Sequence, residues 1–279
     1  MTDIPEGLTP ADDAQPAQWV IDGLVSREHT VRSLVPDGFE AYCRVFHPAS
    51  TYELDGNRQA TNRRRVTWAK IAQESGRVMH PEAQFEAITG LDRYKGDSAM
   101  DHGQPPLWRG SAGDGSLDLD VIKELVPILG AHTDTPEHCY FAHWGGFGWI
   151  EFDLTQITGW FGYPWPNAGR DHMLFQGPLT SAVITLNDPP FHFQSPNVWW
   201  PEDHAWLVAT DIDMDSTYIG GSSACVDAIC SQDGIEALRT EPTHVVTRDG
   251  DRINPPLQPP SFQKPRRTLF GIPIGRSKD

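Results

Sequence analysis

The chain of 279 residues is acidic: it carries 38 Asp and Glu against 22 Lys and Arg, a formal net charge of −16 at pH 7. This charge opposes binding of nucleic acid, whose phosphates need a basic surface. No apolar run approaches the roughly 18 residues of a membrane span. The acidic start of the chain also lacks the basic and apolar regions of a signal peptide. The sequence therefore predicts a cytoplasmic protein without a membrane segment.

Three regions differ in composition. Residues 1–17 are polar and contain proline, which predicts a loose, acidic arm. Residues 18–240 hold the periodic apolar segments and have the length of one large domain. Residues 241–279 are rich in proline and basic side chains. For them we expect an extended tail that could hold a protein partner or a second copy of the chain.

Strands and short helices are mixed within the domain. Alternating apolar and polar residues predict strands at 19–24, 39–47, 138–144, 171–176, 181–186 and 206–219, although 39–47 could also form a short helix. Helical spacing with caps and glycine stops predicts helices at 66–74, 81–88, 117–132 and 224–230. Pro127 is expected to kink or split the third helix, and Asp55-Gly56 to form a hairpin turn. This mixture predicts an α+β fold with a mostly antiparallel sheet flanked by short helices.

The predicted strand at 206–219 carries three aspartates on one face, Asp211, Asp213 and Asp215. Carboxylate oxygens are the ligands that Mg²⁺ and Ca²⁺ prefer. Residues two apart on a strand lie about 6.6 Å apart, so Asp211 and Asp213 could share one ion, whereas all three could do so only at a bulge. The alternative is a solvated acidic strand face, because rows of charges usually face water.

Tryptophan-rich segments are the second candidate site. Trp199 and Trp200 are adjacent and should face opposite ways in extended chain. One of them could form a stacking wall for a sugar or base, beside the turn through Asp203, or both could belong to a packed aromatic corner. Trp144 and Trp149 lie in a segment of aromatic residues and glycine that suits either a ligand platform or an irregular sealed loop.

Motifs for nucleotide binding and hydrolysis are absent from the sequence: there is no phosphate loop, no dinucleotide-binding glycine pattern, no Gly-x-Ser-x-Gly and no His-Glu-x-x-His. Cys139 and His143 could join His132 in a zinc site, but without a fourth ligand they are typical of packing. Arg58 and the run 63–65 form a basic patch, which we interpret as solvated loop charges or as a surface that docks onto an acidic body.

The run from Ser195 to Ser222, SPNVWWPEDHAWLVATDIDMDSTYIGGS, resembles a signature shared by a family of uncharacterised proteins from high-GC Gram-positive bacteria. Further landmarks of that family are similar to short motifs that occur in the same order along the chain. They are Gly38-Phe-Glu-Ala-Tyr42, Phe46-His47-Pro48, Val66-Thr-Trp68-Ala69, His80-Pro81, Thr135-Pro136 and Leu174-Phe175-x-Gly-Pro178. The resemblance covers roughly residues 18 to 240. It implies one unit over that span and brings no activity with it.

Two functional hypotheses follow. The first is a non-catalytic binding or regulatory module, immunity-like in kind, that uses an acidic and aromatic surface. The second is a divalent-metal-dependent hydrolase of phosphate or glycosyl esters, in which Asp211 and Asp213 hold the metal and Asp215 or His204 is the base. An enzyme needs these groups to converge in a pocket, whereas a binding face can leave them apart.

Overall fold

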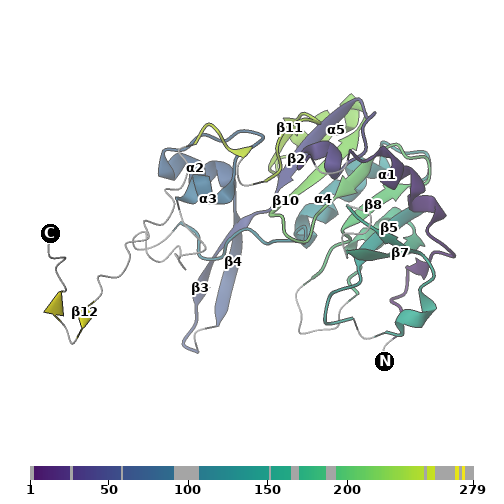
Figure 1. Ribbon diagram of the computed structural model, residues 1–279, viewed down its shortest axis with the longest axis horizontal. Coiled ribbons are helices and arrows are strands. Elements are labelled where there is room, and N and C mark those ends of the chain that lie inside the picture. Colours follow the sequence, from purple (N-terminus) through teal and green to yellow (C-terminus); the bar gives the residue numbers. More distant parts are fainter. Residues whose placement is uncertain are drawn as a thin grey trace, which may run out of the picture.

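An antiparallel sheet of nine strands forms the centre of the protein (Figure 1). The computed structural model describes residues 3–25, 28–57, 59–90, 107–150, 152–164, 170–186, 193–247 and 250–254, with the backbone of 268–269 and 272–273. Within these residues the sheet has the order β1-β7-β5-β8-β9-β10-β2-β11, and β6 pairs with β7. The predicted α+β class, with a mostly antiparallel sheet in one compact domain, is confirmed.

The strands of this sheet are β1 (Thr9–Pro10), β2 (Ala41–Phe46), β5 (Cys139–Trp144), β6 (Trp160–Gly162), β7 (Asp171–Gly177), β8 (Val198–Pro201), β9 (Leu207–Ala209), β10 (Ser216–Gly221) and β11 (Ala237–Thr240). Two further pairs are β3 (Ala49–Leu54) with β4 (Ala60–Val66), and β12 (Thr268–Leu269) with β13 (Ile272–Pro273). The α-helices are α1 (Gln18–Gly23), α2 (Trp68–Ser75), α3 (Phe85–Thr89), α4 (Leu119–Gly130) and α5 (Ser223–Cys230). Single 3-10 turns occupy Gln15–Ala17, Val31–Ser33, Leu154–Gln156 and Leu179–Val183.

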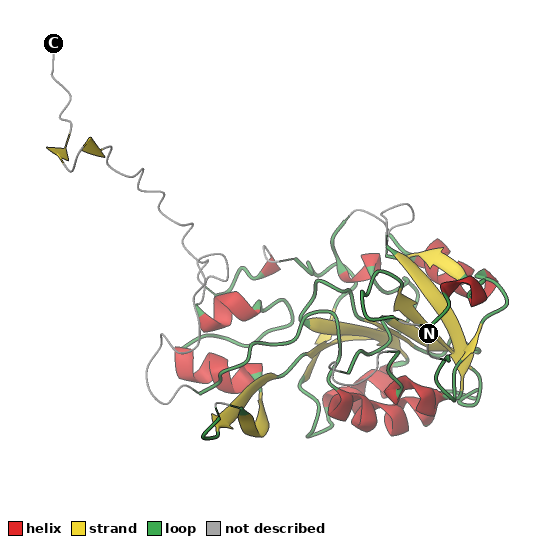
Figure 2. Ribbon diagram, turned by 90° about the horizontal axis from the view of Figure 1, so that it is seen from below, coloured by secondary structure: helices red, strands yellow, loops and turns green. Residues whose placement is uncertain are grey.

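Helices lie on both sides of the sheet (Figure 2). Alternation along each strand divides the buried side chains between two cores. On β2, Cys43 joins the core beneath α4 and α5, whereas Tyr42 joins the core beneath α1. On β8, Trp199 and Trp200 divide in the same way, which confirms that the two rings face opposite directions. Among the described residues, the helices are all too short or too polar to cross a membrane.

A lobe outside the sheet contains the β3–β4 hairpin, α2 and α3 (Figure 1). It has its own core, which includes Phe46, Trp68 and Phe85, with ring centroids about 5 Å apart from one to the next. The predicted turn is confirmed: Oδ1 of Asp55 accepts hydrogen bonds from the backbone N–H groups of residues 57 and 59. The side chain of Asp55 therefore closes the hairpin.

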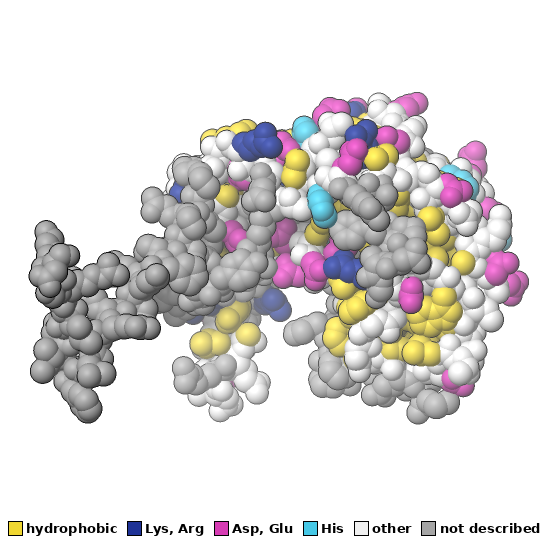
Figure 3. Space-filling view, viewed as in Figure 1, with side chains coloured by type: hydrophobic (Ala, Val, Ile, Leu, Met, Phe, Trp, Pro, Cys, Tyr) yellow, Lys and Arg dark blue, Asp and Glu magenta, His cyan; other side chains and the backbone are white. Residues whose placement is uncertain are grey.

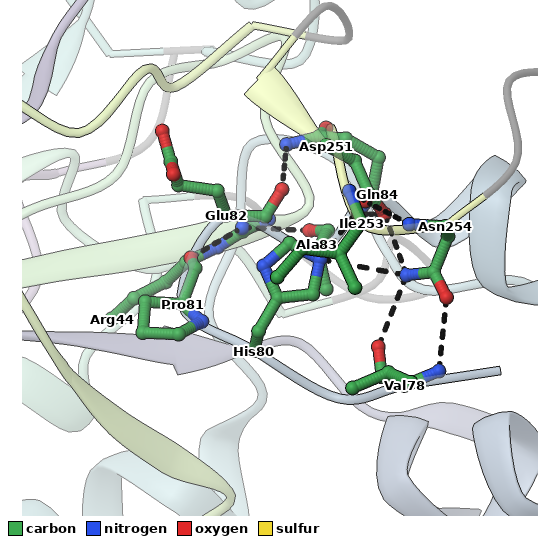
Figure 4. A network of polar contacts seen from close by, with 10 residues as sticks. All are labelled: Arg44, Val78, His80, Pro81, Glu82, Ala83, Gln84, Asp251, Ile253 and Asn254. Atoms are coloured by element: carbon green, nitrogen blue, oxygen red, sulfur yellow. Dashed lines mark hydrogen bonds and ion pairs between the residues drawn. The ribbon is translucent and has the colours of Figure 1, made fainter.

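A buried polar network ties this lobe to the sheet and to residues 250–254 (Figure 4). The guanidinium of Arg44 on β2 donates to the carbonyls of Pro81 and Ala83, at 3.0 and 2.7 Å. Beside it, Nε2 of His80 lies 2.9 Å from Oδ1 of Asp251, and the amide of Asn254 exchanges two hydrogen bonds with the backbone of residue 78. The segment predicted as a tail is thus packed against the body as far as 254; the basic remainder lies outside the described residues.

The helices predicted at 66–74, 117–132 and 224–230 correspond to α2, α4 and α5, whereas the helix predicted at 81–88 is the shorter α3, which begins only at Phe85. α2 and α5 begin at the capping side chains Thr67 and Ser222, and α2 ends at Gly76, whose φ of 65° suits glycine. α4 runs through Pro127 to Gly130 without the split expected as one of two outcomes, and Asp118 caps its start. Pro127 stands in the last turns of the helix, where the loss of one backbone hydrogen bond is tolerated.

Three strand predictions are wrong. Residues 19–24 lie mostly in α1, which follows a 3-10 turn containing Pro16, and 181–186 overlap the 3-10 turn at 179–183. The stretch 206–219 folds back on itself as β9, a turn and β10. Oδ1 of Asp211 accepts from the N–H of residue 213 at 3.0 Å, and its carbonyl accepts from residue 214. Such local bonding by Asp offers the backbone an alternative to a strand ladder, and it places the aspartates in a turn.

Two buried histidines predict how stability depends on pH. Burial lowers the pKa of His143 to about 3 and that of His172 to about 4. Both therefore stay neutral in the folded protein, while the unfolded chain binds their protons below about pH 6.5. Their contribution to stability is complete above that pH and is lost as the pH falls toward 4. We expect the free energy of unfolding to fall by about 2 kcal/mol per histidine between pH 7.5 and 5.

The check is urea denaturation of the wild type and of His143→Phe at these two pH values. The variant should lose less stability on acidification, because Phe has no proton to bind. His138→Gln, at an exposed position, is the matched control and should keep the wild-type slope. An equal pH dependence in wild type and His143→Phe would contradict the assignment.

Candidate ligand-binding cleft

A cavity of about 700 Å³ lies where the chain leaves β2 and enters the β3–β4 hairpin. One wall comes from β4, and the other comes from the loop before α4 and the first turn of that helix. In the space-filling view the molecule is hollowed between the projecting hairpin and the main body (Figure 3). The volume lies within the range of ligand pockets, about 300–1,000 Å³.

The β4 wall is basic. Arg63, Arg64 and Arg65 follow one another and all line the cleft. Arg63 donates to the hydroxyl of Ser50 at 3.2 Å, and Arg65 lies 3.2 Å from the carboxylate of Glu124. Within the described part of the chain, Arg64 has no ion-pair partner. The register of the hairpin shifts between Thr51 and Glu53.

The opposite wall is acidic. Asp114, Asp118 and Asp120 line it, and the last two belong to the start of α4. Carboxylates are stabilised there by the positive end of the helix dipole. Asp118 accepts a hydrogen bond from the N–H of Asp120 at 3.0 Å, and Asp120 pairs with Lys123 at 3.3 Å. The cleft thus has two walls of opposite charge.

Aromatic side chains complete the cleft. Trp149 and Phe193 line it together with Leu117. Trp149 stacks on Phe147 with ring centroids 4.8 Å apart, and Phe147 meets Trp144 edge-on at 5.0 Å. Of the two tryptophans predicted as an aromatic platform, Trp149 therefore lines the cleft. Trp144 contacts Phe147, which in turn packs against Trp149.

His47 lines the cleft but is committed to the fold. Its Nδ1 lies 2.6 Å from the carbonyl of Gly113, and its Nε2 lies 2.9 Å from the hydroxyl of Thr217. Burial lowers the pKa of His47, so Nδ1–H donates to the carbonyl while Nε2 accepts from Thr217. Because both ring nitrogens are occupied, His47 fixes the loop at Gly113 and has no position free for acid–base chemistry.

The predicted metal ligands lie in the turn between β9 and β10. The Arg170 guanidinium bridges two of them: Nη1 lies 2.6 Å from Oδ2 of Asp211, and Nη2 contacts Oδ2 of Asp213. Asp215 instead lies 3.7 Å from Arg44. Asp211 and Asp213 thus meet at one guanidinium, while Asp215 pairs with another. Within the described ranges, no group of three or more His, Cys, Asp or Glu side chains could hold a metal ion.

The candidate base His204 is remote from these carboxylates. It lies in the β8–β9 turn with a φ of 56° and stacks on Trp19, with ring centroids 4.2 Å apart. β9 lies between it and Asp211 along the chain, and the carboxylates whose charge acts on the His204 ring are those of Asp203 and Glu202. The structure thus does not bring His204 and the aspartates together.

Trp199, Trp200 and Asp203 also have structural contacts. The two indoles are 1% and 0% exposed, and they stack on Phe141 and Tyr140 of the neighbouring strand. These contacts fit the alternative in which both tryptophans belong to a packed aromatic corner. The carboxylate of Asp203 accepts hydrogen bonds from the hydroxyl of residue 133 and the N–H of residue 134, at 2.8 and 2.7 Å. Asp203 therefore anchors the loop that follows α4.

The sequence did not reveal the cleft. The run at 63–65 was visible as a basic patch and 117–132 as a helix, but nothing in their spacing indicates that they face each other across a cavity. A scan against protein-family models found no match, and searches of curated proteins and of solved structures found none either.

The Arg170 bridge generates a prediction about the aspartate turn. Arg170→Gln leaves Asp211, whose side chain is 5% exposed, without its partner, and loss of one partner of a buried pair destabilises a protein by about 3–5 kcal/mol. Because Arg170 is 23% exposed, we expect a smaller loss, about 2–3 kcal/mol in urea denaturation. Asp211→Asn in the same chain should restore part of it, and Lys70→Gln, on the exposed side of α2, should have no effect.

In the wild-type protein, Mg²⁺ or Ca²⁺ added after EDTA treatment should leave the Tm unchanged, since the Arg170 guanidinium already pairs with both carboxylates. A metal-dependent rise in Tm that Asp213→Asn abolishes would contradict this account and favour the hydrolase hypothesis. Saturation at 100 times Kd would add about 2.7 kcal/mol, a shift that is easily measured.

Proposed function

We propose that the protein is a non-catalytic binding module of regulatory or immunity-like kind, and that the cleft between the β3–β4 hairpin and α4 is its binding site. The observation that carries this proposal is the pairing of a basic wall with an acidic wall, with aromatic side chains in the lining, in a cavity of about 700 Å³. Opposed charges of this kind give a binding site orientation and specificity.

The lining of the cleft supports binding rather than catalysis. His47 has both ring nitrogens engaged, and the Ser116 hydroxyl both donates to the carbonyl of Phe193 and accepts from the N–H of Ser195. A nucleophile needs a base within hydrogen-bond reach. Neither side chain can supply that pair without losing contacts that hold the loops in place.

The hairpin suggests the kind of ligand. Six of the seven residues of β4 are exposed, and Leu54 near the hairpin tip is 49% exposed. A two-stranded hairpin is marginally stable alone, and charged side chains on an edge strand prevent uncontrolled pairing. An arm of this kind beside a cleft suits a protein partner whose surface offers an acidic group to Arg64 and a basic group to the α4 wall.

The hydrolase alternative would need Arg170 to release Asp211 and Asp213 so that they could hold Mg²⁺ or Ca²⁺. It would also need a base nearer than His204, which leaves Asp215 as its candidate. We therefore place the binding module first. We also infer that it acts in the cytoplasm; the proposed contact of the C-terminal tail with a partner or a second copy lies outside the described residues.

Affinity capture with charge variants tests this function. Immobilised wild type is compared with Arg64→Glu and with Lys70→Glu, a charge reversal of equal size on α2, in a soluble extract of the source cells. A specific partner should bind the wild type and Lys70→Glu, and Arg64→Glu should reduce its retention about tenfold, since a loss of 1.4 kcal/mol corresponds to that factor.

Calorimetry with the purified partner then checks the difference, and added salt should weaken binding because the contact is ionic. Retention of the same partners by wild type and Arg64→Glu alike would contradict the assignment of the cleft. Thermal shift with metals separates this result from the hydrolase alternative, which does not depend on Arg64.

A further inference from the structure

The outer edge of β4 is open beside the cleft. β4 pairs with β3 alone, in a two-stranded sheet separate from the main one. The outer edge of β3 is closed at its base, because the backbone of Ser50 exchanges hydrogen bonds with that of Gly110, at 2.9 and 3.0 Å. Among the residues that the structure describes, no backbone group outside the hairpin bonds to the backbone of 60–66.

The direction of the backbone groups on β4 follows from this pairing. Ser50 bonds to Gly110 through both its N–H and its C=O, so neither group points at Arg65, its partner on β4. In an antiparallel ladder, such a non-hydrogen-bonded pair directs the N–H and C=O of both residues outward. The backbone of Arg65 therefore points away from the hairpin, and by the alternation of the ladder that of Arg63 does as well.

The regular part of this edge begins at Arg63. Asn62 has a φ of 52°, outside the range of a strand, and its side-chain amide donates to the carboxylate of Glu53 at 2.8 Å. At the other end, Thr67 leaves the hairpin and caps α2. Residues 63–66 are thus open to a further strand, over about 14 Å at about 3.4 Å per residue.

The side chains along this edge select the charge of an added strand. Arg63 is bonded to an uncharged hydroxyl, and Arg65 pairs with a glutamate of α4. Arg64 has no ion-pair partner in the described ranges. A second copy of the same strand would bring like charges opposite each other, which destabilises strand pairing, whereas acidic side chains form favourable cross-strand pairs with arginine. The guanidinium groups thus oppose self-association and favour an acidic strand.

We propose that the partner enters the cleft as an extended acidic segment that adds to the edge of β4 as a further antiparallel strand. This inference rests on the proposed function and names the form of the partner. The N–H and C=O of Arg65 exchange two hydrogen bonds with one residue of the segment, and acidic side chains lie opposite Arg63 and Arg64. Strand addition of this kind takes its affinity from main-chain hydrogen bonds and its specificity from side chains.

The opposite wall of the cleft limits the sequence of the segment further. A strand added to β4 lies about 4.8 Å from it, inside the cleft whose other wall carries Asp118 and Asp120. These residues repel a carboxylate and attract an ammonium group. We therefore expect a short acidic run that is flanked by a basic residue.

Titration calorimetry with synthetic peptides tests the proposal on the native full-length protein. The probe is acetyl-KVEEEVK-amide, and its control is acetyl-KVQQQVK-amide, which has the same length and backbone. The acidic probe should bind about tenfold more tightly than the control, since the cross-strand charge pairs are lost in the latter. Arg64→Glu should weaken binding of the probe by about the same factor, whereas Lys70→Glu on α2 should bind it like the wild type.

Backbone methylation distinguishes strand addition from binding through side chains alone. Two forms of the probe carry N-methyl groups on alternate residues, one form from the second residue and the other from the third. Because alternate N–H groups of a strand point to opposite edges, only one form should lose affinity, by about tenfold or more. This comparison uses the wild-type protein and so does not depend on the folding of any variant.

The outcomes separate this inference from the proposed function. Equal affinities of the two methylated forms would overturn strand addition and leave the cleft as a binding site. No binding of the acidic probe, together with a captured partner that depends on Arg64, would also overturn the acidic segment while the proposed function stands. If neither the probe nor a captured partner depends on Arg64, both the inference and the proposed function are wrong.

Discussion

The structure depends on a guanidinium buried at the junction of its two parts. The side chain of Arg44 is 1% exposed, and burial of a charge is expensive unless it is fully hydrogen-bonded. Here Nε donates to the hydroxyl of Ser216, Nη1 donates to two carbonyls of the lobe, and Asp215 supplies the counter-charge at 3.7 Å. The rings of Phe46 and Trp68 lie 4.6 and 5.4 Å from the guanidinium carbon and favour a cation there.

The Arg44 side chain connects the sheet to the lobe that forms one wall of the cleft. A planar group with five donors in a fixed fork can reach the sheet and the lobe at once, which a lysine cannot do. A second link lies nearby: the carboxylate of Glu236 accepts from the first two N–H groups of α2, at 2.6 Å each. Together with the hydrogen bond between His80 and Asp251, these contacts tie the lobe to the sheet and to residues 250–254. The cleft lies along that junction, so its two walls keep their spacing only while the junction holds.

The sequence predicted structure that depends on residues close together in the chain, but it did not predict contacts between distant segments. The strand at 39–47, the turn at Asp55 and the helix at 224–230 follow from residues within a few positions of each other, and the structure bears them out. The turn at Asp211 was not predicted because it depends on a hydrogen bond between the Asp211 side chain and the nearby backbone. The alternation of apolar residues does not indicate such a bond. The cleft and the Arg170 bridge join residues that are 41 or more positions apart, and no spacing rule predicts such contacts.

Amide hydrogen exchange in Arg44→Lys tests the central claim most directly, because this substitution keeps the charge and removes the fork. The account predicts that residues 49–89 and 250–254 lose protection while β5 and β8 keep theirs, since the lobe loosens from an intact sheet. Protection lost evenly over the whole chain, or unchanged in the lobe, would contradict the claim that Arg44 holds the two parts together and thereby forms the cleft.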